Sequence, residues 1–286
     1  MSPEGYVRPV AMIRLALYGA EVGVCMKATR RPAVAGLFYP GDPDELRGVV
    51  CAFLEEAEKT DLVPKALIAP HAGYSYSGPI AGSAYAALQS SGDTIRRVVL
   101  LGPSHRMAIR GLAAPEAHLF AMPFGDVTVD RPAIEGVLDL PQVLLSDLAH
   151  AEEHSLEVQL PFLQTVVGDF TLVPLVVGSA TPEEVEEVLD RLWGGPETLI
   201  VVSSDLSHYE DYDAARQMDE NTSKAIETLN PDAIGPPDAC GRVPIQGLLL
   251  TARKKGLSAH CLDLRSSGDT AGPRDQVVGY GAYAFG

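Results

Sequence analysis

The chain has 286 residues, is 46% hydrophobic, and carries 38 acidic against 22 basic side chains, which gives a net charge of −16. So acidic a surface repels nucleic-acid phosphates and anionic lipids, and we expect neither nucleic acid nor a membrane as a partner. The four cysteines are far apart and form no CxxC pair, so the pattern favours a reducing, cytoplasmic location over a disulfide-bonded secreted fold.

The first residues form a segment of their own. Residues 10–26 are largely apolar, but Arg14 and Glu21 interrupt them, so they fit neither a signal peptide nor a membrane span. We expect residues 1–25 to lie outside the fold, either as a loose extension or because translation starts at Met26. Peptides from residues 1–25 in the native protein would refute the second explanation. Residues 26–286 are expected to form one domain.

Beyond this segment, short apolar runs alternate with amphipathic stretches. Asp42 before Pro43 and Thr181 before Pro182 mark two helix starts. Near-continuous apolar strands separated by helices are typical of a mostly parallel sheet covered on both faces, so we predict a single α/β domain. In chain order, the predicted elements are a helix at 42–58, a strand at 65–69, a helix at 79–89, a strand at 97–102, a helix at 155–166, a strand at 171–177, a helix at 182–193, a strand at 198–203, helices at 212–229 and 244–255, and strands at 259–264 and 277–285.

Three histidines each follow one of these predicted strands: His71, His105 and His208, with Asp205 just before the last. Ligands of open α/β sheets bind beyond the carboxyl ends of the strands. Imidazole is the commonest protein ligand for metals and can also move protons near neutral pH. A single histidine in such a place often only binds loop backbone, but the coincidence of three indicates a functional site.

Two further residues have a structural and a functional explanation. Cys240 precedes the helix predicted at 244–255, and Arg242 lies close by; both would favour the thiolate, which is a metal ligand, whereas a neutral buried thiol would be a core residue. His154 stands at the start of the helix predicted at 155–166. It or Ser155 could cap that helix, or His154 could lie beside a metal as one of the catalytic residues of the site.

Six segments resemble the Memo family, in the same order along the chain. The resemblance extends from Arg31 to the C-terminus and implies a fold shared with class III extradiol dioxygenases, which are non-haem iron enzymes with a central, mostly parallel sheet flanked by helices. The segments are RPAVAGLFYP at 31–40, APHAGY at 69–74, GPSH at 102–105, EHSLE at 153–157, SSDLSH at 203–208 and CGR at 240–242.

The resemblance implies a single-metal site. Its ligands would be His71, His105 and Cys240, the cysteine standing where the dioxygenases have a glutamate. His208 would be the catalytic acid/base, with Asp205 to orient its imidazole. The resemblance implies an iron or copper ion, and a thiolate in place of a carboxylate favours Cu(I) or a redox-active iron.

Two classes of function remain as expectations. One is a redox enzyme related to the dioxygenases, acting on a small molecule in the metal pocket. The alternative is a non-catalytic protein that handles metal or binds a peptide or other partner. Bacterial and archaeal family members are called AmmeMemoRadiSam system protein B after their gene neighbours, so the partners of such a scaffold would be neighbouring gene products in a radical-SAM-associated pathway. The acidic surface argues against a phosphopeptide.

Overall fold

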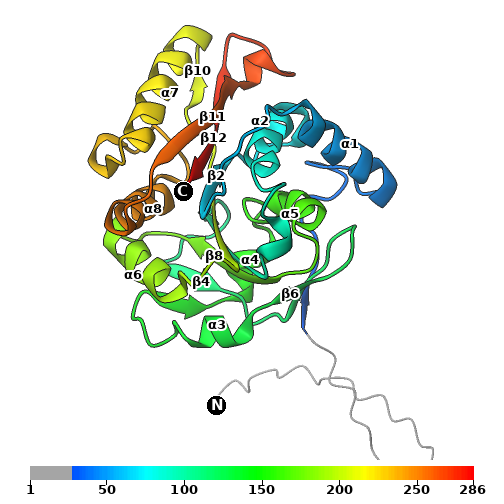
Figure 1. The fold of residues 1–286 in the computed structure, drawn as a ribbon, viewed down its shortest axis with the longest axis vertical. Coiled ribbons are helices and arrows are strands. Elements are labelled where there is room, and N and C mark those ends of the chain that lie inside the picture. Colours follow the sequence, from blue (N-terminus) through cyan, green and yellow to red (C-terminus); the bar gives the residue numbers. More distant parts are fainter. Residues whose placement is uncertain (1–27) are drawn as a thin grey trace, which may run out of the picture.

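The computed structural model describes residues 28–286, in which helices cover both faces of one twelve-stranded sheet (Figure 1). The expected extension at residues 1–25, the alternative start at Met26, and Cys25 lie outside the described residues. None of the helices in the described part of the chain is long and apolar enough to cross a membrane. The α/β architecture predicted from the alternating pattern is confirmed.

The centre of the sheet is parallel and buried, because its strands are continuous apolar runs with helices on either side. Its strands lie in the order β8, β3, β9, β2. β12 then pairs antiparallel with β2, and it also pairs antiparallel with β11 and β10. The bounds are β2 Ala66–Ala69, β3 Arg97–Pro103, β8 Thr171–Val177, β9 Thr198–Ser203, β10 His208–Glu210, β11 Ala259–Ser266 and β12 Val277–Phe285.

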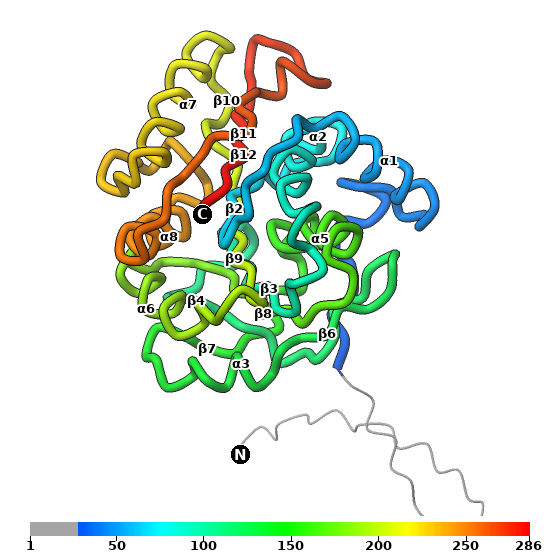
Figure 2. The backbone as a smooth tube through the Cα atoms, in the orientation of Figure 1, coloured from blue at the N-terminus to red at the C-terminus, as the bar shows by residue number. Residues whose placement is uncertain are grey.

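Helices pack on the two faces of this sheet, and Figure 2 shows the same course of the chain as a tube. α1, α2 and α5 lie on one side, and α6, α7 and α8 on the other (Figure 1). The bounds are α1 Pro43–Glu56, α2 Tyr74–Ala86, α3 Arg131–Glu135, α4 Asp147–Ala151, α5 Leu160–Val166, α6 Pro182–Leu192, α7 Tyr212–Glu227 and α8 Arg242–Lys255. Two starts are capped as predicted: Asp42 accepts bonds from the first turn of α1, and Thr181 forms a capping box with Glu184.

The other half of the sheet contains short strands that the sequence pattern did not predict. Strands of two or three residues are too short to show an alternating pattern, and their pairing partners are distant in the chain. They extend the sheet on the far side of β8. Their bounds are β1 Thr29–Arg30, β4 Leu112–Ala114, β5 Leu119–Phe120, β6 Val127–Val129 and β7 Val143–Leu145.

Two predicted helices begin elsewhere. α2 starts at Tyr74, and Pro79, which was interpreted as the start of the helix, lies inside it. The helix predicted at 155–166 begins only at Leu160, after a 3-10 turn at Glu157–Gln159. The residues before it are held by long-range side-chain bonds rather than by helical ones, so neither His154 nor Ser155 caps a helix; the Ser155 hydroxyl donates to the Pro103 carbonyl instead.

Candidate metal centre

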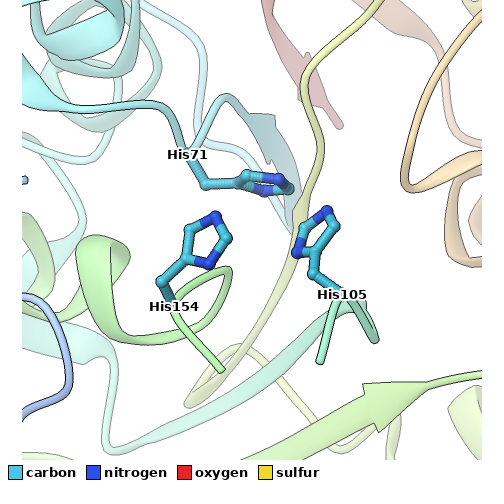
Figure 3. Close-up of side chains that lie close together, drawn as sticks. All are labelled: His71, His105 and His154. Carbon is cyan, nitrogen blue, oxygen red and sulfur yellow. The ribbon is translucent and has the colours of Figure 1, made fainter. Parts of the chain in front are cut away.

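Three histidines meet at the carboxyl edge of the parallel strands. His71 follows β2, His105 follows β3, and His154 lies between α4 and the 3-10 turn. One ligand nitrogen from each ring lies within 4.8 Å of the others. Figure 3 shows the three imidazoles facing one another from three separate segments. The structure therefore brings His71 and His105 together and adds His154, which sequence reasoning placed only beside a metal.

The rings are close and mostly shielded from water. The centroids of His71 and His105 are 5.2 Å apart, and those of His105 and His154 are 4.8 Å apart in a stacked arrangement. Burial, with a further contribution from His105, lowers the pKa of His71 to about 3. Burial, with a further contribution from His71, lowers the pKa of His154 to about 4. Both imidazoles are thus neutral at pH 7, which is the form that binds a metal.

Hydrogen bonds fix which nitrogen of His71 carries the proton. Its Nδ1 lies 2.8 Å from the Ser203 hydroxyl oxygen, which also receives a bond from the Gln159 amide. The single hydroxyl proton of Ser203 goes to the Ser155 carbonyl, 2.6 Å away, because that carbonyl can only accept. Nδ1 of His71 must therefore be the donor to Ser203. Nε2 is left with a free lone pair, as in a metal-ligating histidine oriented by its surroundings.

Glu153 fixes His105 in the same way. Its carboxylate accepts bonds from the His105 backbone at 2.6 Å and from Nδ1 of the His105 ring at 3.0 Å, and also from the backbone of Ser155 at 2.9 Å. Burial alone would raise the pKa of Glu153, but these bonds outweigh it and hold the pKa well below its usual range. An ionised carboxylate only accepts, so the proton of His105 is on Nδ1 and its Nε2 lone pair is free.

His154 has a buried nitrogen without a partner. Its Nδ1 makes no hydrogen bond within residues 28–286, and the nearest carboxylate oxygen, on Glu153, is 3.6 Å away. The Phe38 ring packs against its edge at 4.9 Å. Buried polar atoms in native proteins nearly always have a partner, so this unsatisfied nitrogen is unusual within a cluster of three imidazoles. The donors present therefore fit a transition metal.

Cys240 lies next to His71, at the side of the three imidazoles. Its Sγ is 3.3 Å from Nε2 of His71. The expectation that this thiol ionises easily is wrong. Burial, together with the charge of Asp205, raises the pKa of the thiol to about 12. α8 starts at Arg242 rather than Pro244, but its N-terminus does not outweigh desolvation. A neutral thiol can donate to Nε2, and a metal ion would have to displace that proton.

Asp205 and His208 complete the surroundings. Asp205 accepts a bond from the His71 backbone at 2.7 Å, and burial, opposed by that bond, raises its pKa. It was expected to orient His208, but Nδ1 of His208 instead donates to the Leu206 carbonyl at 2.7 Å. The second nitrogen of His208 is thereby left free. Its charge affects the pKa of both His71 and Asp205, so it lies near the cluster.

Two residues that orient the histidines had no assigned role in the sequence interpretation: Glu153 and Ser203. Both stood within motifs that resemble the family, but nothing in a single sequence distinguishes a carboxylate that holds a ligand from one on the surface. The adjacency of Glu153 to His154 was the one available signal.

Comparisons with known proteins identify the family. The family model described as Memo-like protein matches residues 30–284. A MEMO1 family protein of Saccharolobus solfataricus is 34% identical over 90% of this chain and 99% of its own length. A MEMO1 family protein of Methanopyrus kandleri is 36% identical over 90% of this chain and 98% of its own length. A MEMO1 family protein of Aquifex aeolicus is also 36% identical, over 88% of this chain and 97% of its own length. The crystal structure of an uncharacterized Escherichia coli K12 protein has a TM-score of 0.46 at 15% identity, covering 75% of this chain and 98% of its own, a likeness too slight to support an argument. The chain belongs to the Memo family.

Proposed function

We propose that this protein binds a single iron or copper ion through His71, His105 and Cys240. The observation that carries the proposal is the pair of oriented imidazoles: Ser203 and Glu153 accept hydrogen bonds from the two Nδ1 atoms, so both Nε2 atoms are unprotonated, and the partner of Nε2 in His71 is the Cys240 thiol. The Cys240 sulfur beside His71 supplies a soft donor, which suits Cu(I) or a redox-active iron.

His154 is a competing third ligand. Its nitrogen already lies within 4.8 Å of those of His71 and His105, whereas the one imidazole that the sulfur of Cys240 contacts through a hydrogen bond in residues 28–286 is that of His71. An ion shared by three nitrogens would leave Cys240 as a fourth donor, and an ion shared with the sulfur would leave His154 beside it. The two arrangements differ in whether the ion has a thiolate ligand.

The test is metal analysis of protein purified without air, with the variants Cys240→Ser, His154→Gln and His105→Ala. We expect about one ion per chain in the wild type, little in His105→Ala, and a marked loss in Cys240→Ser. The variant His260→Gln, which changes an exposed histidine on β11, is the matched control and should keep its metal. If Cys240→Ser keeps its full metal content and His154→Gln loses metal, then the third ligand is the His154 imidazole and not the Cys240 sulfur. Wild-type protein without metal would refute the centre.

We further propose that the centre is a redox site related to that of the dioxygenases, on the strength of the family and the open donor set. The ion would supply Lewis acidity and one-electron chemistry. His208 has a free ring nitrogen near the cluster, so it is positioned to take or give a proton to a bound small molecule. Oxygen uptake by the Fe(II)-loaded protein across a panel of catechol-like substrates, lost in His208→Ala, is the expected result; no uptake with any substrate would refute it.

The partly buried thiol favours a second candidate, a metal-handling protein without turnover that acts with proteins of a radical-SAM-associated pathway. A neutral thiol against an imidazole is a ready Cu(I) site once its proton leaves. This candidate predicts tight Cu(I) binding that is lost in Cys240→Ser, together with no product from any substrate. Pull-down with adjacent gene products tests the partner role.

A further inference from the structure

A pocket of about 370 Å³ lies between α7 and β11, which pack side by side (Figure 1). Tyr212, Arg216 and Asp219 of α7 line it together, because residues three and four positions apart lie on one face of a helix. Leu264 lines it from β11. Its volume is within the range of roughly 300 to 1,000 Å³ that is usual for small-molecule sites. No lining residue belongs to the histidine cluster, so the pocket is separate from the proposed metal centre.

The charged side chains that line the pocket are, with one exception, paired with an opposite charge. The pairs are Arg216 with Glu220, Arg265 with Asp263, and Asp269 with Arg274, at 3.2, 2.5 and 3.6 Å. Asp269 also accepts a 2.6 Å bond from the Tyr212 hydroxyl, which ties the start of α7 to the turn after β11. Because both lining arginines already have a carboxylate partner, an anionic ligand would have to compete with that partner.

Asp219 is the exception. The residue is only 3% exposed, and no lysine or arginine in residues 28–286 pairs with it. Its Oδ1 accepts a 3.0 Å bond from the Ser207 backbone. Its Oδ2 lies against Gly279 of β12, where a Cβ atom would come within 2.0 Å of that oxygen, so the glycine makes room for the carboxylate. The fold thus holds one carboxylate at the pocket wall without a cation.

The size of the pocket and the number of its unpaired carboxylates narrow the class of the missing cation. Buried charges in proteins are normally paired or bound to a metal. Ca²⁺ and Mg²⁺ take about six or more oxygen ligands, and Asp219 alone supplies too few. A pocket of about 370 Å³ with Tyr212 and Leu264 in its walls has room for an organic body as well as a charge. The arrangement therefore fits an organic ammonium ion.

We propose that the pocket between α7 and β11 binds a small primary amine in its ammonium form, with Asp219 as the counter-ion and Tyr212 and Leu264 against the apolar body of the ligand. The ammonium group donates to the Asp219 carboxylate, which gives the buried charge the partner that the protein does not supply. This site goes beyond the proposed metal function, and it neither needs the ion nor shares a residue with its ligands.

The experiment is a calorimetric titration at pH 8, where Asp219 is ionised because its pKa is about 6. The probes are phenethylamine, which is cationic at that pH, and 2-phenylethanol, in which a hydroxyl replaces the ammonium group. Asp219→Asn keeps the shape of the side chain and removes its charge. Asp213→Asn is the matched control, since it removes one charge from an exposed residue of the same helix outside the pocket. Leu264→Trp fills the pocket and leaves the charge of Asp219 in place.

We expect the wild type and Asp213→Asn to bind phenethylamine with the same Kd, and 2-phenylethanol much more weakly. The Kd for phenethylamine should rise about tenfold to a hundredfold in Asp219→Asn, as is usual for the loss of a hydrogen bond to a charged group. Leu264→Trp should also lose binding, whereas His105→Ala, which disrupts the histidine cluster, should keep it.

Four results would each overturn the inference. The first is a wild type that does not bind phenethylamine, and the second is an unchanged Kd in Asp219→Asn. The third is an equal loss in Asp213→Asn, which would mean that the amine is attracted only by the net negative charge of the chain. The fourth is a loss in His105→Ala, which would place the amine at the metal centre. None of the first three results bears on whether the histidine cluster binds an ion.

Discussion

Residues 153–157 contribute to two groups of buried polar side chains. The two groups differ in how many of their hydrogen-bond donors and acceptors have a partner. In the first, the carboxylate of Glu157 is bonded to the Arg30 guanidinium, to the backbone of Ala33 and Val34, and to the Tyr39 hydroxyl. The guanidinium also donates to two backbone carbonyls, those of residues 150 and 153. This Glu157 network is saturated, so it needs no ligand.

The histidine cluster is the second group, and it is only partly satisfied. His105 has one nitrogen bonded to Glu153, His71 has only the Cys240 thiol at its second nitrogen, and His154 has a buried nitrogen without any partner in the described chain. A saturated buried network stabilises a fold, whereas a cluster of imidazoles with unsatisfied nitrogens could hold a metal ion. The Glu157 network is then the scaffold that holds the His154 segment against residues 33–39.

The largest effect should come from breaking the scaffold. Glu157→Gln leaves the buried charge of Arg30 without its counter-ion, which typically costs about 3 to 5 kcal/mol of the free energy of unfolding. Equilibrium denaturation measures it. Asp139→Asn, which breaks the exposed pair with Arg191, is the control and should cost less than about 1 kcal/mol. Equal losses in the two variants would mean that the Glu157 network is no more important than a surface ion pair.

The next effect tests the unsaturated group. If the histidine cluster binds an ion, a free ion concentration of about 100 times its Kd should raise the free energy of unfolding by about 2.7 kcal/mol, and a chelator should remove the gain. His105→Ala should lose the increment. His150→Gln is the contrasting variant, since His150 is also buried but donates to the Ala113 carbonyl outside the cluster. This variant should be less stable than the wild type, but the ion should still raise its free energy of unfolding. If the ion fails to stabilise both variants, the assignment of the ion to the histidine cluster is contradicted.

Asp219 sharpens the comparison, because it is a buried carboxylate with no paired cation. Burial, opposed by bonds from Ser207 and reinforced by the charge of Asp238, raises its pKa from 3.8 to about 6. The folded protein therefore holds this proton more tightly than the unfolded chain. Its contribution to stability is complete below about pH 4 and is lost as the pH rises through about 6.

The variant Asp219→Asn should remove that dependence. Each pK unit corresponds to about 1.36 kcal/mol, so the variant should be more stable than the wild type by about 3 kcal/mol at pH 7 and about equal at pH 4. Denaturation curves from pH 4 to 8 measure the difference. A variant that is less stable at pH 7 would show that the charged carboxylate is satisfied, like Glu157.

Sequence reasoning succeeded where the signal was local. β8 and β9 have the predicted bounds because buried parallel strands are unbroken apolar runs, and His71 and His105 could be placed at one edge because each follows such a strand. Sequence reasoning was insufficient where contacts between segments distant in the chain determine the position of a side chain. The ring of His154 is brought into the cluster by bonds from residues 30–39 to Glu157, more than a hundred residues away in the chain.

Cys240 shows a second reason why the sequence alone was insufficient. Its place before a helix suggested an easily ionised thiol, but that local effect is smaller than the desolvation caused by packing against Asp205 and His71. Burial of this kind depends on the whole fold. The motifs brought attention to these residues, while their protonation states required the hydrogen-bond partners, above all Ser203 and Glu153.

The smallest effect concerns Ser203, which keeps the proton of His71 on Nδ1. In Ser203→Ala that acceptor is gone, and the neutral ring can place its proton on Nε2, where it blocks the metal. We expect about tenfold weaker metal binding, and nitrogen NMR of the histidine side chains should show His71 changing from a single Nδ1-protonated form to a mixture. Ser77→Ala removes an equally buried hydroxyl, which donates to the Ala72 carbonyl, and should leave both measurements unchanged. If His71 keeps its Nδ1 proton in Ser203→Ala, then the ring is oriented by its packing, and the free lone pair of Nε2 owes nothing to Ser203.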